Sequence, residues 1–171
     1  IYRLGRLVGR CSDGTFQVNP DSNAFYLLLK GILALGVVPD TMADHLTDLT
    51  PVDYSADAVL ALEGTQERVF HLMSPRQTRM EEIVRAILPD TRFVPEPEFE
   101  KRLSQCLANG YQADLMPLAD FWHHIKAAPP VIEVSAEYTW QLLEKQGFHR
   151  EIPGPGRLLQ NFLFETQRHD G

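Results

Sequence analysis

Two short apolar segments, residues 2–8 and 68–73, constrain the fold of this chain of 171 residues more than any other feature. Each is bounded by turn residues and followed by a stretch with helical periodicity, which gives the order strand, helix, strand, helix. Parallel strands that are apolar on both faces need neighbouring strands at both edges and helices above and below. Two strands cannot supply these neighbours, so we expect the later half of a larger α/β unit.

Helical patterns follow both segments. Asp21 or Ser22 can cap a first helix whose apolar residues repeat at helical spacing until Gly36, after which residues 37–39 open a connecting segment. Asp53 can cap a second helix over residues 54–63. A third helix is predicted to start at residues 74–75, where a proline occupies a position that suits the first helical turn.

Beyond Pro89 the sequence is predicted to be mostly helical, over residues 98–109, 115–126, 136–145 and 157–166. The pattern contains no convincing boundary between two complete domains. We therefore expect one partial domain over residues 1–171. Residues 1–75 would form the end of the sheet with an inserted loop, and residues 76–171 a mostly helical part.

Composition excludes several classes of protein. A formal net charge of -7 argues against binding to nucleic acid, whose partners normally carry a basic surface. No segment approaches the roughly 18 apolar residues of a membrane span, and the first residues lack the zones of a secretory signal, so we expect a cytoplasmic protein without a membrane partner. The two cysteines, Cys11 and Cys106, have no paired spacing and are interpreted as reduced thiols.

Several motifs, in their order and spacing, resemble the thioester reductase domain that ends many nonribosomal peptide synthetases, a member of the extended short-chain dehydrogenase/reductase superfamily. The matching segments are residues 3–9, 12–17, 23–26, 35–40 and 50–56, with Asn19, residues 70–73 and residues 134–148. The resemblance covers most of the chain and implies an α/β fold. The chain would be the later half of the Rossmann-like domain together with a mostly helical substrate-binding subdomain.

In such enzymes NADPH reduces an acyl or peptidyl thioester, held on the phosphopantetheine of a carrier protein, to an aldehyde or an alcohol. The resemblance implies that Leu4, Gly5, Arg6 and Leu7 border the cofactor, although the family pattern has asparagine at the position of Arg6. It also implies that a further set of residues lines the entrance for substrate and phosphopantetheine. These residues are Ser12, Asp13, Phe16, Gln17 and Asn19.

We place no catalytic and no metal-binding residue in this sequence. It contains no glycine-rich turn of the G-x-G-x-x-G type between a strand and a helix. Tyr26 and Lys30 have the spacing of a reductase Tyr-x-x-x-Lys pair, but the family's pair precedes the segment that matches residues 3–9, so packing and solvation explain them better. His123 and His124 are adjacent in a predicted helix and point about 100° apart, which does not favour one metal ion.

The leading hypothesis is that this sequence is the substrate-binding part of an NADPH-dependent thioester reductase, with an acyl or peptidyl carrier protein and the missing N-terminal reductase half as its partners. Two alternatives stay open. The first is a redox-inactive module that recognises a carrier protein, and the second is a cyclase that releases the product without redox chemistry.

Overall fold

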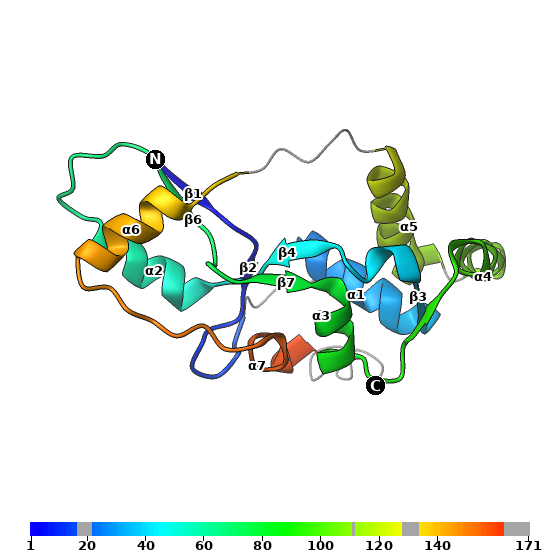
Figure 1. The fold of residues 1–171 in the computed structure, drawn as a ribbon. Coiled ribbons are helices and arrows are strands. Elements are labelled where there is room, and N and C mark those ends of the chain that lie inside the picture. The colour runs from blue at the N-terminus through cyan, green and yellow to red at the C-terminus, as the bar shows by residue number, and fades with distance from the viewer. Residues whose placement is uncertain (17–21, 111, 128–133, 163–171) are drawn as a thin grey trace. The chain divides into compact units, whose positions relative to one another are not determined.

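The computed structural model describes residues 1–16, 22–110, 112–127 and 134–162 (Figure 1). Contacts divide the chain into two compact units, each built from separate stretches of sequence. The first unit comprises Ile1–Phe16, Leu46–Thr78 and Ile132–Glu165, and the second comprises Gln17–His45, Arg79–Val131 and Thr166–Gly171. The chain therefore passes from one unit to the other several times.

The first unit combines short strands with three helices. Its strands are β1 (Tyr2–Leu4), β2 (Leu7–Val8), β4 (Leu46–Asp48), β5 (Thr50–Pro51), β6 (Phe70–Leu72) and β7 (Gln77–Arg79), whose last residue falls in the second unit. Its helices are α2 (Val52–Ala61), α6 (Glu137–Lys145) and α7 (Pro155–Leu158).

The second unit is mainly helical. Its helices are α1 (Ala24–Leu35), α3 (Met80–Ile87), α4 (Glu96–Ala108) and α5 (Gln112–Ala127), with the short 3-10 helix η2 (Asp40–Met42). Its strands are β3 (Val37–Pro39) and β8 (Arg92–Val94), which pair in parallel. The expected α/β class with a mostly helical later part is thus confirmed.

Strand pairing in the first unit joins segments far apart in the sequence. β1 pairs in parallel with β6, and β2 pairs in parallel with β5. β4 pairs with β7. The sequence predicts one strand over residues 2–8, but the structure has two, β1 and β2. The chain leaves the β1–β6 ladder at Gly5 and Arg6, and β2 then pairs with β5.

The core of the first unit lies between β6 and two helices. Its buried residues are Ala58 and Leu62 from α2 and the loop after it, Phe70 and Leu72 from β6, and Leu143 from α6. Tyr2 of β1 stacks on Phe70, with ring centroids 5.2 Å apart. Tyr2 and Leu4 remain 41% and 46% exposed, so one face of β1 is only half covered by the described residues.

The core of the second unit is built on α1. Most of the circumference of this helix is buried, and the buried residues include Phe25, Leu29 and Ile32. The helix packs mainly against α5. Phe99 of α4 meets Trp122 of α5 edge to face at 5.2 Å. As predicted, α1 stops at Gly36, whose φ of 68° lies in the left-handed region that favours glycine.

Three local predictions need correction. The first helix was predicted to be capped by Asp21 or Ser22, but its cap is Asn23, whose Oδ1 accepts from the N–H groups of Phe25 and Tyr26. Asp21 itself lies outside the described residues. Residues 37–39 form strand β3, since their side chains are buried and their main chain pairs in parallel with β8. The third helix starts at Met80 instead of residues 74–75, since strand β7 intervenes.

No helix in the described ranges is both long and apolar enough to span a lipid bilayer.

The Asn23 cap gives a stability prediction. Replacing Asn23 by Ala removes the acceptor for two main-chain N–H groups at the start of the helix that centres the second core, and should lower the free energy of unfolding by about 0.5–2 kcal/mol. Asn23→Ser keeps an acceptor and should stay close to the unchanged protein. Urea unfolding followed by circular dichroism measures both, and equal losses in the two variants would contradict the capping role.

Candidate functional site

The carboxyl ends of β1 and β6 meet at a pocket of about 420 Å³. The Gly5 N–H donates to the Leu72 carbonyl oxygen at 2.8 Å, which continues the ladder one residue beyond β1. In open α/β sheets, ligands bind outside the carboxyl ends of the strands, which makes this pocket the candidate functional site. Its lining consists of Arg3, Leu4, Gly5, Arg6, Asp48, His71, Met73 and Val134.

The carboxylate of Asp48 organises the wall of this pocket. Its Oδ2 accepts from the Arg6 main-chain N–H and from the Thr50 hydroxyl, both at 2.8 Å. The Thr50 Oγ1 in turn accepts from the Ser74 N–H at 2.8 Å. One buried polar network therefore links the loop after β1, the end of β4, the start of β5 and the segment after β6.

Gly5 is needed for reasons of space. A Cβ atom at this position would lie 2.0 Å from Asp48 Oδ2 and 2.6 Å from Thr50 Oγ1, which no side chain tolerates without movement of the network. The absence of a side chain at Gly5 thus lets the Asp48 carboxylate reach the main chain of the next residue.

Arg6 brings a partly buried positive charge to the pocket. Its Nε donates to Thr47 Oγ1 at 2.9 Å. Burial lowers the pKa of the Arg6 guanidinium, while the Asp48 carboxylate beside it raises that pKa. Arginine nevertheless stays protonated in proteins. The pocket wall therefore carries a cation that has lost part of its hydration, which favours an anionic ligand.

Three of the four residues predicted to border the cofactor line this pocket. Leu4 ends β1, and Gly5 and Arg6 follow it, whereas Leu7 begins β2 and is not part of the lining. The structure brings the three together, and their role toward a cofactor stays a prediction.

The residues predicted to contact substrate lie in the loop after β2. In this loop Arg10 and Asp13 form an ion pair at 2.5 Å, and the Gly14 N–H donates to the Arg10 carbonyl oxygen at 2.8 Å. The Thr15 N–H donates to Asp13 Oδ1 at 2.9 Å, and this main-chain hydrogen bond is the main reason why the pKa of Asp13 is lowered. The loop is thus a defined turn.

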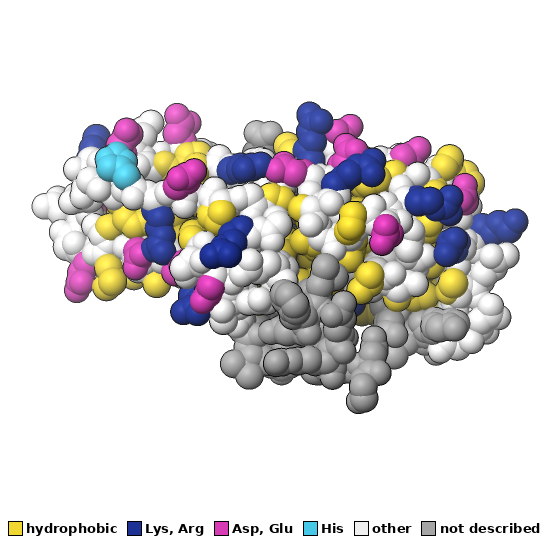
Figure 2. All heavy atoms as spheres, turned by 90° about the horizontal axis from the view of Figure 1, so that it is seen from below, with side chains coloured by type: hydrophobic (Ala, Val, Ile, Leu, Met, Phe, Trp, Pro, Cys, Tyr) yellow, Lys and Arg dark blue, Asp and Glu magenta, His cyan; other side chains and the backbone are white. Residues whose placement is uncertain are grey.

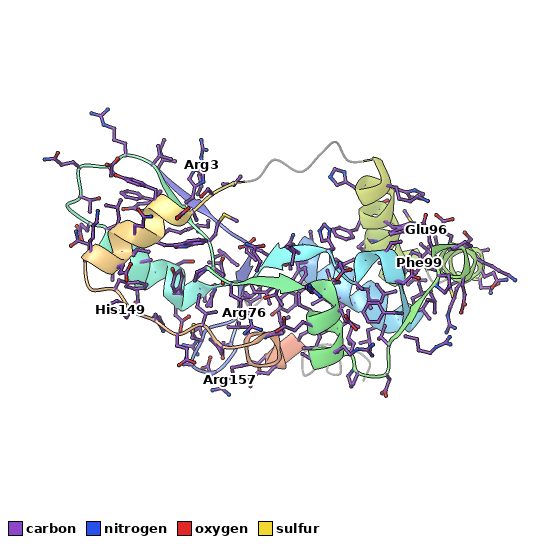
Figure 3. All side chains as sticks on the ribbon, in the orientation of Figure 1. Arg3, Arg76, Glu96, Phe99, His149 and Arg157 are labelled. Atoms are coloured by element: carbon purple, nitrogen blue, oxygen red, sulfur yellow. The ribbon has the colours of Figure 1, made fainter. Side chains whose placement is uncertain are left out.

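The C-terminal segment of the first unit holds this loop in place (Figure 3). Arg157 of α7, labelled there, donates to the Ser12 carbonyl oxygen, and Gln160 donates to the Asp13 carbonyl oxygen. Gly9 also packs tightly, since a Cβ there would lie 2.5 Å from the Leu158 carbonyl oxygen. Three main-chain positions of the loop region, at Gly9, Ser12 and Asp13, therefore depend on α7 and the residues after it.

The substrate set and the cofactor set do not share one pocket wall. Ser12, Asp13 and the half-buried Phe16 are absent from the lining of the pocket at β1 and β6. Gln17 and Asn19, which complete the predicted substrate set, lie outside the described residues.

A second pocket, of similar size, lies beside α2 and α6. Tyr54 and Phe148 meet edge to face there at 5.4 Å, and the Trp140 indole N–H donates to the Met73 carbonyl oxygen at 2.9 Å. The lining residues are Tyr54, Pro75, Trp140, Leu143, Phe148, His149, Arg150 and Glu151. Its aromatic walls belong to the packing of α6 against α2.

Asp53 ties three segments together beside this second pocket. Its carboxylate accepts from the Cys11 N–H at 3.0 Å and pairs with Arg150 Nη2 at 2.7 Å, while Arg150 also pairs with Asp57. The prediction that Asp53 caps α2 is wrong, because the helix starts at Val52 after Pro51 and Asp53 sits in its first turn. Its acceptor capacity serves the loop at Cys11 and the arginine.

Sequence reasoning missed Arg3, Asp48 and His71 as pocket residues. Nothing in the sequence distinguishes Asp48 from the other acidic residues nearby, and only its hydrogen bond to the main chain of Arg6 reveals its role. Arg3 and His71 become neighbours because β1 and β6 pair in register, which places Arg3 opposite His71. Charged or polar residues inside two apolar strand segments were the signal available in the sequence.

Tyr26, Lys30, His123 and His124 are not among the lining residues of the two pockets described above. Tyr26 is 2% exposed and belongs to the buried side of α1, as expected for a packing residue. Across the ranges that the structure describes, no three His, Cys, Asp or Glu side chains gather in a way that could hold a metal ion.

Comparison with known proteins finds the same fold in reductase domains. A thiolation-reductase di-domain from an archaeal non-ribosomal peptide synthetase is 30% identical and gives a TM-score of 0.80, over 98% of this chain and 36% of that one. The reductase domain of the aureusimine biosynthetic cluster is 16% identical with a TM-score of 0.79, over 99% of this chain and 45% of that one.

A third solved structure agrees. The terminal R domain of the myxalamid PKS-NRPS biosynthetic pathway is 22% identical with a TM-score of 0.70, over 99% of this chain and 44% of that one. No protein-family model matches the chain. No curated protein matches it either.

These matches define a class of fold. The chain has the α/β fold of the C-terminal part of a reductase domain of the kind found in nonribosomal peptide synthetase and mixed polyketide clusters. The resemblance expected from the sequence is thereby confirmed, and the chain spans less than half the length of the solved chains that it matches.

The space at Gly5 gives a second prediction. Gly5→Ala should lower the free energy of unfolding by about 1–3 kcal/mol, because the added methyl group forces the Asp48 carboxylate away from the main chain of Arg6. Gly154→Ala is the matched control, since nothing lies within 4 Å of a Cβ there. Urea unfolding compares the two, and a Gly5→Ala variant as stable as the control would contradict the proposed close approach.

The Cys11 thiol gives a third prediction. Burial raises its pKa, the Asp53 carboxylate raises it further, and Arg150 acts in the opposite direction. Its alkylation, measured against pH in a Cys106→Ser variant, should therefore reach half its maximal rate at a higher pH than for an unfolded cysteine.

Asp53→Asn removes the neighbouring negative charge and should shift this alkylation midpoint to lower pH. Asp57→Asn is the control, because Asp57 pairs with Arg150 but does not bind the Cys11 main chain. A midpoint that moves equally in both variants would show that the general charge of this region, rather than Asp53, sets the reactivity of the thiol.

Proposed function

We propose that this chain forms the substrate-side part of an NADPH-dependent thioester reductase, which releases a carrier-bound acyl or peptidyl thioester as an aldehyde or an alcohol. The supporting observation is the likeness over 98% of the chain, at 30% identity, to a thiolation-reductase di-domain. That solved protein joins a thiolation domain to its reductase, which supports an acyl or peptidyl carrier protein as the partner here.

The pocket at the ends of β1 and β6 suits the border of a cofactor site. NADPH would supply the hydride for the thioester carbonyl. Leu4 would offer an apolar surface and Arg6 a positive charge, while the N–H of Arg6 is already taken by Asp48. The sequence has no glycine-rich turn between a strand and a helix, so the pyrophosphate would be held by residues outside these 171.

The loop after β2 would form the substrate side. Ser12, Asp13 and Phe16, with Gln17 and Asn19, would line the entrance for the acyl group and its phosphopantetheine arm. The hydrogen bonds from Arg157 and Gln160 to the main chain of Ser12 and Asp13 would fix the loop before substrate arrives, which reduces the entropy lost on binding.

An open strand edge supports a larger domain around this part. Among the described residues β1 pairs only with β6, and Tyr2 and Leu4 stay largely exposed. Unpaired strand edges with apolar side chains favour association with another strand. We infer that a further strand of the reductase domain pairs with β1.

Charged side chains of both signs are mixed on the described part of the face drawn in Figure 2, without a broad area of one sign. The described part of this face therefore carries no basic track of the kind that binds nucleic acid.

The test uses a reductase domain that contains this chain, with an acyl thioester on a carrier protein as substrate. NADPH consumption is followed by absorbance and the product by mass spectrometry. Arg157→Ala should raise the KM for the carrier-bound thioester roughly two- to tenfold, as expected for loss of one hydrogen bond, and leave the KM for NADPH unchanged.

Arg85→Ala is the control, because the contacts of Arg85, an exposed ion pair with Glu81 and a cation–π contact with Phe93, involve no residue of the loop after β2. Saturable carrier binding without NADPH consumption would favour the recognition module instead. Product release without NADPH consumption would favour the cyclase. Equal losses for thioester and NADPH in Arg157→Ala would contradict the division of labour between the two sets of residues.

A further inference from the structure

Arg3 and His71 form a pair across two strands. They are register partners in the parallel β1–β6 ladder, in which neighbouring strands lie about 4.8 Å apart. Successive side chains of a strand point to opposite faces, and the neighbours of His71, Phe70 and Leu72, belong to the apolar core. The Arg3–His71 pair therefore occupies the other face, where both residues line the pocket at the strand ends (Arg3 is labelled in Figure 3).

One ring nitrogen of His71 is buried without a partner. Within the described part of the chain Nδ1 is shielded from solvent and makes no hydrogen bond, and only the main-chain N–H of His71 donates, to Thr139 Oγ1 at 3.1 Å. An unpaired buried acceptor is tolerated better than an unpaired buried donor. The ring proton therefore belongs on Nε2, which is the remaining polar atom of the ring and can donate to a ligand in the pocket.

The charge balance of the pocket favours an anion. The pocket is lined by Arg3, Arg6 and a single carboxylate, that of Asp48. The Asp48 Oδ2 already accepts from the Arg6 main chain and from Thr50. Arg3 is exposed and forms no ion pair with any residue that the structure describes, so its five N–H donors are available.

We propose that this pocket binds a phosphate group through the Arg3 guanidinium and His71 Nε2, with the charge of Arg6 in support. The planar arginine fork matches the oxygens of a phosphate, and a pocket of about 420 Å³ is large enough for a small ligand that carries one. As far as the source of the phosphate is concerned, the inference rests on the proposed function, in which the phosphopantetheine arm and NADPH both carry phosphate.

The experiment is calorimetric titration of a reductase domain that contains this chain with four probes, namely 4′-phosphopantetheine, pantetheine, NADPH and inorganic phosphate. Phosphopantetheine should bind about tenfold or more tightly than pantetheine, as expected for one charge-assisted hydrogen bond. Arg3→Gln and His71→Phe should each remove most of this difference. His71→Gln, which keeps an N–H donor, should retain part of it.

Arg68→Gln is the matched control, because Arg68 precedes β6, the strand that carries His71, but is not part of the pocket lining. Circular dichroism verifies that each variant is folded. If NADPH is the probe whose affinity depends on Arg3 and His71, the phosphate site is supported and belongs to the dinucleotide. If all probes bind the Arg3→Gln, His71→Phe and unchanged chains alike, the proposal is rejected.

A separate readout distinguishes this failure from failure of the proposed function. An enzyme with Arg3→Gln and His71→Phe that still reduces the carrier-bound thioester with unchanged KM values would reject the phosphate site and leave the reductase function standing.

Discussion

The Asp48 carboxylate is the interaction on which the architecture of the first unit depends. Three parts of the sequence meet at this group, namely the turn after β1, the end of β4 with the start of β5 at Thr50, and the segment after β6 through Ser74. A partly buried carboxylate is stable only when its oxygens accept hydrogen bonds. The network meets this requirement and at the same time holds the short strands, which have few ladder hydrogen bonds of their own.

Asp53 repeats the same principle in the first turn of α2. There a second carboxylate accepts from the main chain of a distant loop, at Cys11, and is balanced by Arg150. In both cases an aspartate replaces pairing between strands as the means of fixing an irregular segment. The two loops that we associate with cofactor and substrate are thus positioned by separate polar anchors, which allows their geometry to vary independently.

The elements that could be predicted from the sequence are those with long, regular patterns. The apolar spacing of α1 and its stop at Gly36 were sufficient to place that helix. β2 and β5, with two residues each, are too short for any period to show. The α/β class followed from motif order, and so did the choice of Leu4 to Arg6, which line the pocket and whose role toward a cofactor stays a prediction. Asp48 and His71 could not be found in this way, because their partners come close only when the strands pair.

The first unit is assembled from three separate stretches of sequence, and long segments of the second unit lie between them. No single cut can therefore release either unit with its core intact, because α6 and β6 of the first core are separated by most of the second unit. The two units must be inherited, expressed and selected as one piece of sequence. Exchange of this region between related proteins would have to carry both units together, since a single crossover between α2 and α4 would split both cores.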